Sequence, residues 1–478
     1  MKPSKLTRLA AAASALLLLA SLAGCAKKDA TPAPLVPQYH TPNKLPSYTL
    51  TEDTTDYRAL ALATFENKEV APAEAFEYET TEDGGIRLTA YTGDGGTVIL
   101  PDTIDEKPVT ALGTGLFADS ETVTALSIPD SVTSIEQDLL TGCRTIRVLR
   151  TPQLGATRED AGYLAYFFGA DTPKGMGFKV PSSLDTLILS DGLTKLDASA
   201  LLDCSRLRMV LLPDTLTEIG DFALSGCSQL HFVPLPNALT AIGRYAFSGC
   251  TSLVHMEISD GVKTIGLGAL MGCQALQQLT LPFVGESLDA KTVSLGHVFG
   301  AETYTHNAGF IPKSLCRVTL TQGNVPDYAF YNCSEIAEVV LPAACERIGV
   351  RAFFGCANLR GITLPDSLRT IGELAFAHCT GMSNISFNQT LSEIGIQAFM
   401  DCYNLTEITL PDSLTTLPAS AFADCRCLKT VTLGQNLTAI GAQAFRNCSS
   451  LTTVSGANPA LQISQGNEYL AQILTPAE

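Results

Sequence analysis

The chain repeats one pattern of apolar and polar positions along most of its length. One unit, residues 404–425, reads NLTEITLPDSLTTLPASAFADC. Its first part, LTEITL, alternates apolar and polar residues, which predicts a short half-buried strand. The Pro-Asp pair ends that strand with turn residues, and SLTTL predicts a second extended piece. The closing ASAFADC places apolar side chains at helix-like spacing over a turn or two.

Regularly spaced cysteines define the length of the repeat. In two runs they recur at one constant interval: Cys204, Cys227, Cys250 and Cys273, then Cys333, Cys356, Cys379, Cys402, Cys425 and Cys448. A single unit cannot bury its apolar residues alone. Stacked units can, when their strands pair side by side about 4.8 Å apart. The pattern therefore predicts a solenoid whose core is built from the same positions of every unit.

Two longer intervals interrupt this spacing. The step from Cys143 to Cys204 and the step from Cys273 to Cys333 are each more than twice the regular interval. The inserted stretches resemble each other: LAYFFGADTPKGMGFKVPSSLDTLIL in the first and LGHVFGAETYTHNAGFIPKSLCRVTL in the second. Each replaces an AFxxC turn with a longer aromatic loop. We expect two protruding loops, near residues 151–180 and 283–314, on the same kind of edge.

The repeated LxxIxLPxxLxxIGxxAFxxCxxL resembles the BspA-like leucine-rich repeat of bacterial surface proteins, over roughly residues 85–453. The resemblance implies an α/β repeat fold, a right-handed leucine-rich-repeat solenoid of about 23-residue units with short parallel strands and short helical turns. It also implies a surface protein that binds or adheres and has no catalytic activity. It names no ligand.

The first 24 residues resemble a lipoprotein signal peptide, with a basic start, an apolar run and the ending LAGC. In the bacterial lipobox that this ending resembles, the cysteine, here Cys25, carries the lipid and anchors the chain to the membrane. Residues 25–48, rich in Pro and Thr, predict a tether. We expect an N-terminal cap at 49–93, the solenoid at 94–453 and a C-terminal cap at 454–478. These features predict an extracytoplasmic, membrane-anchored protein.

The composition and the motifs limit the functions that the chain can have. The formal net charge of −17 argues against nucleic acid, which needs clustered Lys and Arg. The sequence contains no GxSxG, P-loop or dinucleotide-binding fingerprint, and neither an HExxH motif nor paired CxxC motifs. His297 and His306 share the second loop but lack zinc-ligand spacing. Asp residues recur after the strand, where a turn explains them better than a calcium site. We therefore predict no enzyme, no metal and no cofactor.

The cysteine ladder is expected to stay reduced. Equivalent positions in stacked units present parallel side chains at least about 4.8 Å apart. A disulfide instead needs Cβ atoms that face each other at about 3.8 Å. Buried thiols acting as small apolar side chains explain the pattern better. Cys316, Cys345 and Cys427 lie off the ladder, and the sequence leaves their state open.

Positions that the repeat leaves free are the best candidates for binding. The middle residue of each IxL strand points out of the core, and Ile188, Leu211 and Pro234 would place apolar side chains there. We interpret them as a contact surface, or alternatively as a patch that the neighbouring loop covers. The loops supply the remaining candidate ligand-binding residues: Tyr163, Tyr166, Phe167, Phe168, His297, Phe299 and Tyr304.

These observations predict a membrane-anchored surface protein that binds a protein or a glycan non-covalently over its extended face and its two loops. Two alternatives stay open. One is a structural spacer in the cell envelope without a specific ligand. The other is an enzyme that uses loop residues such as His297 or His306.

Overall fold

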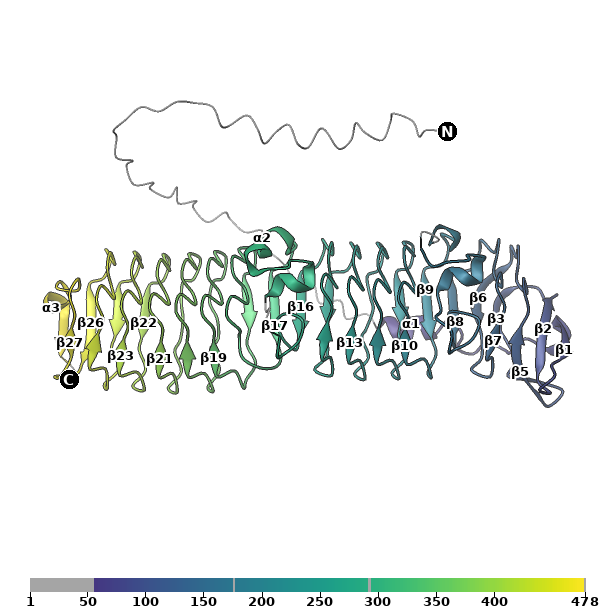
Figure 1. The fold of residues 1–478 in the computed structure, drawn as a ribbon, viewed down its shortest axis with the longest axis horizontal. Coiled ribbons are helices and arrows are strands. Elements are labelled where there is room, and N and C mark those ends of the chain that lie inside the picture. Colours follow the sequence, from purple (N-terminus) through teal and green to yellow (C-terminus); the bar gives the residue numbers. More distant parts are fainter. Residues whose placement is uncertain (1–55, 175–176, 291–293, 477–478) are drawn as a thin grey trace, which may run out of the picture. The chain divides into compact units, whose positions relative to one another are not determined.

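The computed structural model describes residues 56–174, 177–290 and 294–476. Within this part, the chain winds into successive coils that stack along one axis (Figure 1). Most regular coils add one strand to each of two series of parallel strands, and a few contribute an isolated bridge instead. The expected signal peptide, Cys25 and the tether up to residue 48 lie outside the described residues. No helix of the described part is both long and apolar enough to cross a membrane.

The first strand series comes from the LxxIxL segments. Its five N-terminal strands pair in the order β11-β9-β8-β6-β3, and their bounds are β3 (Gly96–Ile99), β6 (Val123–Ser127), β8 (Val148–Thr151), β9 (Thr186–Leu189) and β11 (Met209–Leu211). The series continues as β14 (His255–Glu257), β16 (Gln278–Leu281), β17 (Arg317–Leu320), β18 (Glu338–Val340), β22 (Glu407–Thr409), β24 (Thr430–Thr432), β26 (Thr453–Ala457) and β28 (Leu474–Pro476). Side chains alternate between core and outer face along each of these strands.

The second strand series consists mostly of two-residue strands from the LxxI segments. Its members are β5 (Lys107–Leu112), β7 (Ser134–Ile135), β10 (Lys195–Leu196), β12 (Glu218–Ile219), β13 (Ala241–Ile242), β15 (Thr264–Ile265), β19 (Arg347–Ile348), β20 (Thr370–Ile371), β21 (Glu393–Ile394), β23 (Thr416–Leu417), β25 (Ala439–Ile440) and β27 (Gln462–Ile463). At the N-terminal end, β1 (Phe76–Thr80) pairs antiparallel with β2 (Ile86–Tyr91), and β2 pairs parallel with β5. A short strand, β4 (Thr103–Ile104), forms a hairpin with β5.

Helices contribute little to the described part. Three short α-helices are present, α1 (Tyr57–Leu62), α2 (Asn307–Phe310) and α3 (Leu470–Ile473), with five 3₁₀ turns, η1 (Ala73–Ala75), η2 (Leu164–Phe168), η3 (Gly177–Lys179), η4 (Leu295–Phe299) and η5 (Tyr304–His306). The regular AFxxC segments are hydrogen-bonded turns and not helices. The α/β description expected from the sequence is therefore too generous, and the chain is a parallel β-solenoid with turns on its third side.

Stacked aromatic rings form the centre of the core in the C-terminal half. The phenylalanines of six successive AFxxC segments lie face to face, with centroids 5.0–5.8 Å apart, at Phe330, Phe353, Phe376, Phe399, Phe422 and Phe445. Their backbones are linked as well, because each of these turns hydrogen-bonds to the next. The amide of Phe399, for example, donates to the carbonyl of Ala421 at 2.8 Å. The stacked rings, the cysteine thiols and the backbone hydrogen bonds between coils thus all recur once per coil.

The glycine of the IG pair has a steric cause. A side chain built on Gly395 would place its Cβ 2.3 Å from the backbone nitrogen of Glu373 in the preceding coil. Backbone cannot move aside as a flexible side chain can, so glycine permits the closest approach of two coils at this corner. Gly372 faces the backbone of the coil before it in the same way, at 2.7 Å. The repeated glycine therefore follows from how closely the coils stack.

Candidate binding surfaces

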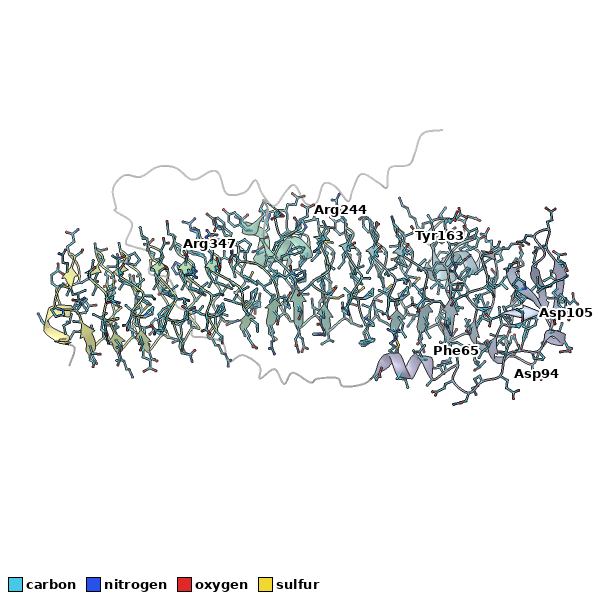
Figure 2. The ribbon with its side chains drawn as sticks, turned by 90° about the horizontal axis from the view of Figure 1, so that it is seen from below. Phe65, Asp94, Asp105, Tyr163, Arg244 and Arg347 are labelled. Atoms are coloured by element: carbon cyan, nitrogen blue, oxygen red, sulfur yellow. The ribbon has the colours of Figure 1, made fainter. Side chains whose placement is uncertain are left out.

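The apolar trio on the outer face does not form an open patch. Ile188 and Leu211 are only 4% and 5% exposed, and Pro234 is half-buried. The N-terminal segment covers them, because Ala61 of α1 and Phe65 pack on Ile188 and Leu211 in a small apolar cluster apart from the main core. Figure 2 shows α1 and Phe65 beside the strands. The expectation of an exposed apolar surface is therefore wrong for this pair, and the cover is not the first loop.

Polar contacts help to hold α1 in place. Its N-terminus is capped by Asp56, whose Oδ1 accepts a hydrogen bond from the amide of Ala59 at 2.9 Å. Arg58 pairs with Asp214 across a 3.5 Å gap. Both partners of that pair are more than half exposed, so it adds little to stability. Apolar burial provides most of the contact, and sequence periodicity gave no sign of it because α1 has only six residues.

In the first loop, most of the aromatic candidates belong to the core. Phe167 and Phe168 are buried in η2, which takes the place of a regular AFxxC turn within the stack. The amide of Leu140 in the coil before donates to Phe167, and the amide of Leu164 donates to Ala200 in the coil after. The two phenylalanines therefore have no surface for a ligand, which corrects the sequence-based expectation.

The two tyrosines of the first loop are half-buried, and their hydroxyl groups are engaged. Tyr163 donates to the carbonyl of Ala170 at 2.9 Å, and Tyr166 donates to the carbonyl of Ile135 at 3.3 Å. The rings meet edge to face, with centroids 6.0 Å apart. Tyr163 thus fastens the loop to itself and Tyr166 fastens it to the preceding coil, so contact with a ligand stays a proposal for their exposed edges alone.

The second loop repeats this arrangement. Phe299 is fully buried in η4, so it too is a core residue and not a ligand contact. His297 stands where Tyr166 stands in the first loop, and its Nε2 donates to the carbonyl of Ile265 at 3.1 Å. Ile265 occupies the same position in its coil as Ile135, so histidine and tyrosine make equivalent hydrogen bonds. Tyr304, by contrast, keeps part of its ring at the surface.

His297 makes the second loop sensitive to acid. Burial lowers the pKa of His297 below its ordinary value of about 6.5, against the opposing effects of the Ile265 hydrogen bond and Glu286. The folded protein therefore takes up this proton at lower pH than the unfolded chain. The neutral form of His297 stabilises the fold fully above the pKa that this histidine has in the unfolded chain. This stabilisation is lost as the pH falls through the pKa that it has in the folded protein. We expect urea unfolding at about pH 8 and about pH 5 to show this loss.

The matched variant for this experiment is His297→Tyr, which copies Tyr166 of the first loop. It should reduce the slope of the free energy of unfolding against pH, by an amount that corresponds to at most about one bound proton. His306→Gln is the control, because His306 is exposed and its ring lies 3.3 Å from Thr303 Oγ1, without a hydrogen bond to the coil of Ile265 in the described part. Equal pH dependence in the wild type and His297→Tyr would contradict the assignment.

A group of partly exposed rings lies at the edge beside the second loop. We call Tyr304, Tyr328, Tyr331 and Phe354 the aromatic edge. Tyr304 stacks on Tyr328 with centroids 4.2 Å apart, and Tyr331 stacks on Phe354 at 5.1 Å. The guanidinium of Arg351 lies 6.0 Å from the centroid of the Tyr328 ring. Several coils thus contribute to one surface of tyrosine, phenylalanine and arginine.

Sequence reasoning found only Tyr304 of this edge. The others occupy variable positions around the AFxxC turns, in YAFYNC and RAFFGC, and not the outward positions of the strands at which binding residues were expected. The positive φ of Tyr328, 59°, does not distinguish it, because Arg351, Leu374 and Gln397 adopt the same left-handed conformation at the equivalent position of the following coils.

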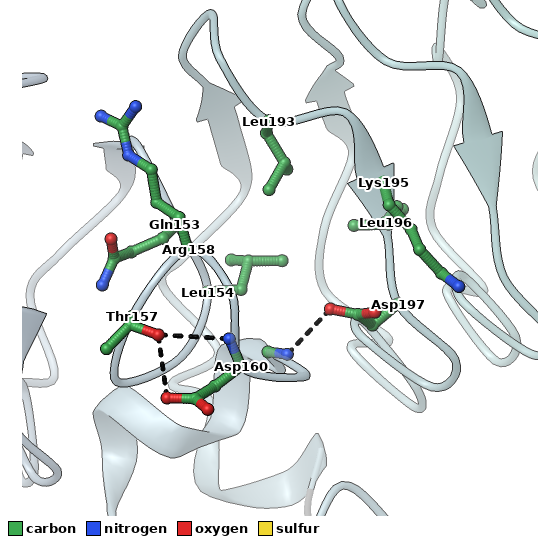
Figure 3. A pocket seen from close by; sticks show the side chains of 10 residues that line it. Gln153, Leu154, Thr157, Arg158, Asp160, Leu193, Lys195, Leu196 and Asp197 are labelled. Carbon is green, nitrogen blue, oxygen red and sulfur yellow. Dashed lines mark hydrogen bonds between the residues drawn. The ribbon is translucent and has the colours of Figure 1, made fainter. Parts of the chain in front are cut away.

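A small hollow lies below the first loop (Figure 3). Its volume is about 10 Å³, about the room that one water molecule needs. Asp197 closes one side by accepting a hydrogen bond from the amide of Gly162 at 3.0 Å, and Thr157 and Asp160 bond to each other on the other side. This hollow is too small for an organic ligand, so it belongs to the packing of the loop.

The thiols have the character of core side chains. All fourteen cysteines in the described part are free, and only Cys427 is partly exposed, which agrees with the expected reduced ladder. Burial raises the pKa of the Cys356 thiol to about 12, so the reactive thiolate is suppressed. Most regular ladder thiols also bond to the preceding coil, as Cys402 does to the carbonyl of Phe376 at 3.3 Å. Cys204 and Cys333 instead bond to a carbonyl of their own coil at 3.9 Å.

One of the carboxylates that follow the strands links two coils. Asp412 accepts a hydrogen bond from the amide of Gln435 in the next coil at 2.7 Å. Among the described residues, no group of three or more His, Cys, Asp or Glu side chains is arranged to hold a metal ion.

Solved structures that resemble the chain include several bacterial leucine-rich repeat proteins. A protein from Bacteroides ovatus is 19% identical, with 83% of this chain and 99% of that chain covered and a TM-score of 0.36. A leucine-rich cell surface protein from Faecalibacterium prausnitzii is 21% identical, with 86% and 98% covered and a TM-score of 0.29. The pneumococcal vaccine antigen PcpA is 16% identical, with 85% and 97% covered and a TM-score of 0.28. No curated protein matches the chain.

A family model identifies the repeat. The model of the BspA type leucine rich repeat region matches in six copies, over residues 99–159, 177–292 and 323–452. These ranges include more than half of the chain and leave out parts of both inserted loops. The chain therefore belongs to the BspA-type leucine-rich repeat family.

Proposed function

We propose that this chain is a membrane-anchored cell-surface protein that binds a partner non-covalently and has no enzymatic role. The observation that carries the proposal is the aromatic edge, where tyrosine and arginine gather at the surface beside a loop that interrupts the repeat. Tyrosine and arginine are enriched in the energetically dominant parts of protein interfaces. Lipidation of Cys25 would supply the anchor and place the solenoid outside the cytoplasm.

The stack itself favours a protein partner at this edge. Tyr304 comes from the second loop, while Tyr328 and Phe354 come from successive coils that share the core. Rings held by neighbouring coils lose little freedom on binding, so less free energy is spent on ordering them. A structural spacer would need no such surface, because the core alone keeps the coils together.

The test is a binding screen of the full chain against extracellular matrix proteins and a glycan array. For a protein ligand found in this way, the double variant Tyr328→Ala and Tyr331→Ala should weaken binding by about tenfold or more. Ile396→Ala, which truncates an apolar side chain that is 49% exposed, serves as the control and should bind like the wild type. A ligand whose affinity is the same for all three proteins would remove the aromatic edge from the proposal.

A further inference from the structure

A second hollow, larger than that of Figure 3, opens where the first loop returns to the stack. Its volume is about 270 Å³. η3 and the residues just after it form one wall, and the coil that follows Cys204 forms the other. Of the lining residues, Phe178, Ser182, Ser205 and Arg206 are exposed and Pro181 is half-buried. The hollow thus combines one aromatic ring, two hydroxyl groups and one guanidinium.

The aromatic wall is held by the backbone. Phe178 is 78% exposed, more than any other large apolar residue of the described part. Gly177 directly before it lies against the adjacent coil, where an added Cβ would come within 2.3 Å of the carbonyl oxygen of Asp203. This close approach fixes η3 beside the hollow while the ring of Phe178 stays in solvent. A ring presented in this way offers its surface to a ligand.

Arg206 gives the hollow its charge. The chain has a net charge of −17, and several of its arginines pair with acids at 2.7–3.5 Å, among them Arg317 with Glu338, Arg347 with Asp327 and Arg446 with Asp424. Arg206 has no such partner in the described part of the chain. The acid nearest in sequence, Asp203, turns its Oδ1 toward Gly226 of the next coil. The guanidinium of Arg206 is therefore available to an anionic group.

The second loop shows which of these features are specific to the first. Gly309 stands in the second loop where the first loop has Phe178, and Glu335 stands in the coil after the second loop where the coil after the first loop has Arg206. The exposed aromatic ring and the positive charge thus occur together at the first loop, and both are replaced at the second.

We propose that this hollow binds the carboxylate-bearing sugar at the end of an acidic glycan. The guanidinium of Arg206 would hold the carboxylate with two parallel hydrogen bonds. The ring of Phe178 would pack on the apolar face of the sugar, and Ser182 and Ser205 would bond to its hydroxyls. A short peptide with a free C-terminus carries the same carboxylate and is therefore the competing probe in the test. The site is independent of the aromatic edge.

The experiment measures binding of single sugars to the full chain by calorimetry. N-acetylneuraminic acid and glucuronic acid are the acidic probes, and N-acetylglucosamine is the neutral one. We expect at least one acidic sugar to bind and the neutral sugar to bind at least about tenfold more weakly. Arg206→Gln and Phe178→Ala should each weaken acidic-sugar binding, by about tenfold for Arg206→Gln. Arg369→Gln changes another exposed arginine and should leave binding intact.

Several outcomes would overturn the proposal. They are equal affinity for acidic and neutral sugars, unchanged binding by Arg206→Gln, absence of binding by both acidic sugars, or tighter binding of a short peptide with a free C-terminus. Both changes lie at the surface, so an unchanged unfolding midpoint verifies that the variants are folded. Tyr328→Ala with Tyr331→Ala should bind acidic sugars like the wild type. This variant separates failure of the acidic-sugar site from failure of the proposed protein binding.

Discussion

Replacing Phe399 by alanine should lower the free energy of unfolding by about 3–5 kcal/mol. The ring is fully buried and is stacked between Phe376 at 5.2 Å and Phe422 at 5.1 Å, with Phe387 packed edge to face at 5.6 Å. Its removal takes away apolar burial and leaves a cavity that the rigid coils on both sides cannot fill. Urea unfolding followed by circular dichroism measures the loss.

The loss should be local at first. In a stack where each coil touches only its neighbours, a weakened coil uncouples the parts on either side. Hydrogen exchange should therefore rise most in the coils that contain Phe376 and Phe422. Phe178→Ala is the matched control, because it removes the same atoms from a ring that is 78% exposed, and it should cost less than about 1 kcal/mol. A comparable loss in both variants would show that Phe399 is not part of the core.

The second large effect is expected at the C-terminal end of the stack, where Asn467→Ala should cost about 2–4 kcal/mol. The side chain of Asn467 is completely buried. Its Oδ1 accepts from the amide of Phe445 at 3.2 Å, and its Nδ2 donates to the carbonyls of Gly441 at 2.9 Å and Ser464 at 3.0 Å. Alanine would leave these three backbone groups without their partner inside the protein.

Thermal unfolding and hydrogen exchange of β27 would measure this effect, since the last coil should open before the rest. Asn237→Ala is the control, because Asn237 lies in an exposed turn between coils and its loss should cost less than about 0.5 kcal/mol. If Asn467→Ala unfolds like the control, the terminal coil is held by apolar contacts alone.

The period was predictable because the core imposes it. Every coil must place apolar side chains and a small thiol at the same points, so the constant spacing of the cysteines from Cys333 to Cys448 reveals the stack directly. Strand positions followed from the alternation in LTEITL, and free thiols followed from the geometry of parallel side chains. The family assignment and the structure confirm the leucine-rich repeat solenoid.

Surface properties were harder to predict, because the repeat pattern carries no information about segments outside the repeat that pack on its surface. The sequence marks Leu211 as pointing out of the core, which is correct, but cannot tell that Ala61 and Phe65 return to cover it. In the loops, Phe167 and Phe299 looked like free aromatic residues because their spacing departs from AFxxC. They are core residues, since η2 and η4 rebuild the missing turn from a different sequence.

Buried asparagines were missed for a related reason. Asn467 and Asn307 are both completely buried, and each bonds backbone groups of neighbouring coils. Each appears once, outside the regular units, so no periodicity marks it. Only their position at an irregular segment, where backbone groups lack their usual partners, distinguishes them from surface turn residues.

The way in which the loops join the stack affects how their sequences can evolve. η2 and η4 preserve the hydrogen bonds between coils: Leu140 to Phe167 and Leu164 to Ala200 in one case, Leu270 to Val298 and Leu295 to Ala329 in the other. The segment that follows each 3₁₀ turn is released from this pattern until the next strand begins. The exposed positions of such a segment can therefore diverge between the two copies, and between relatives, while η2 and η4 keep the coils in register and buried residues such as Asn307 keep the segment attached.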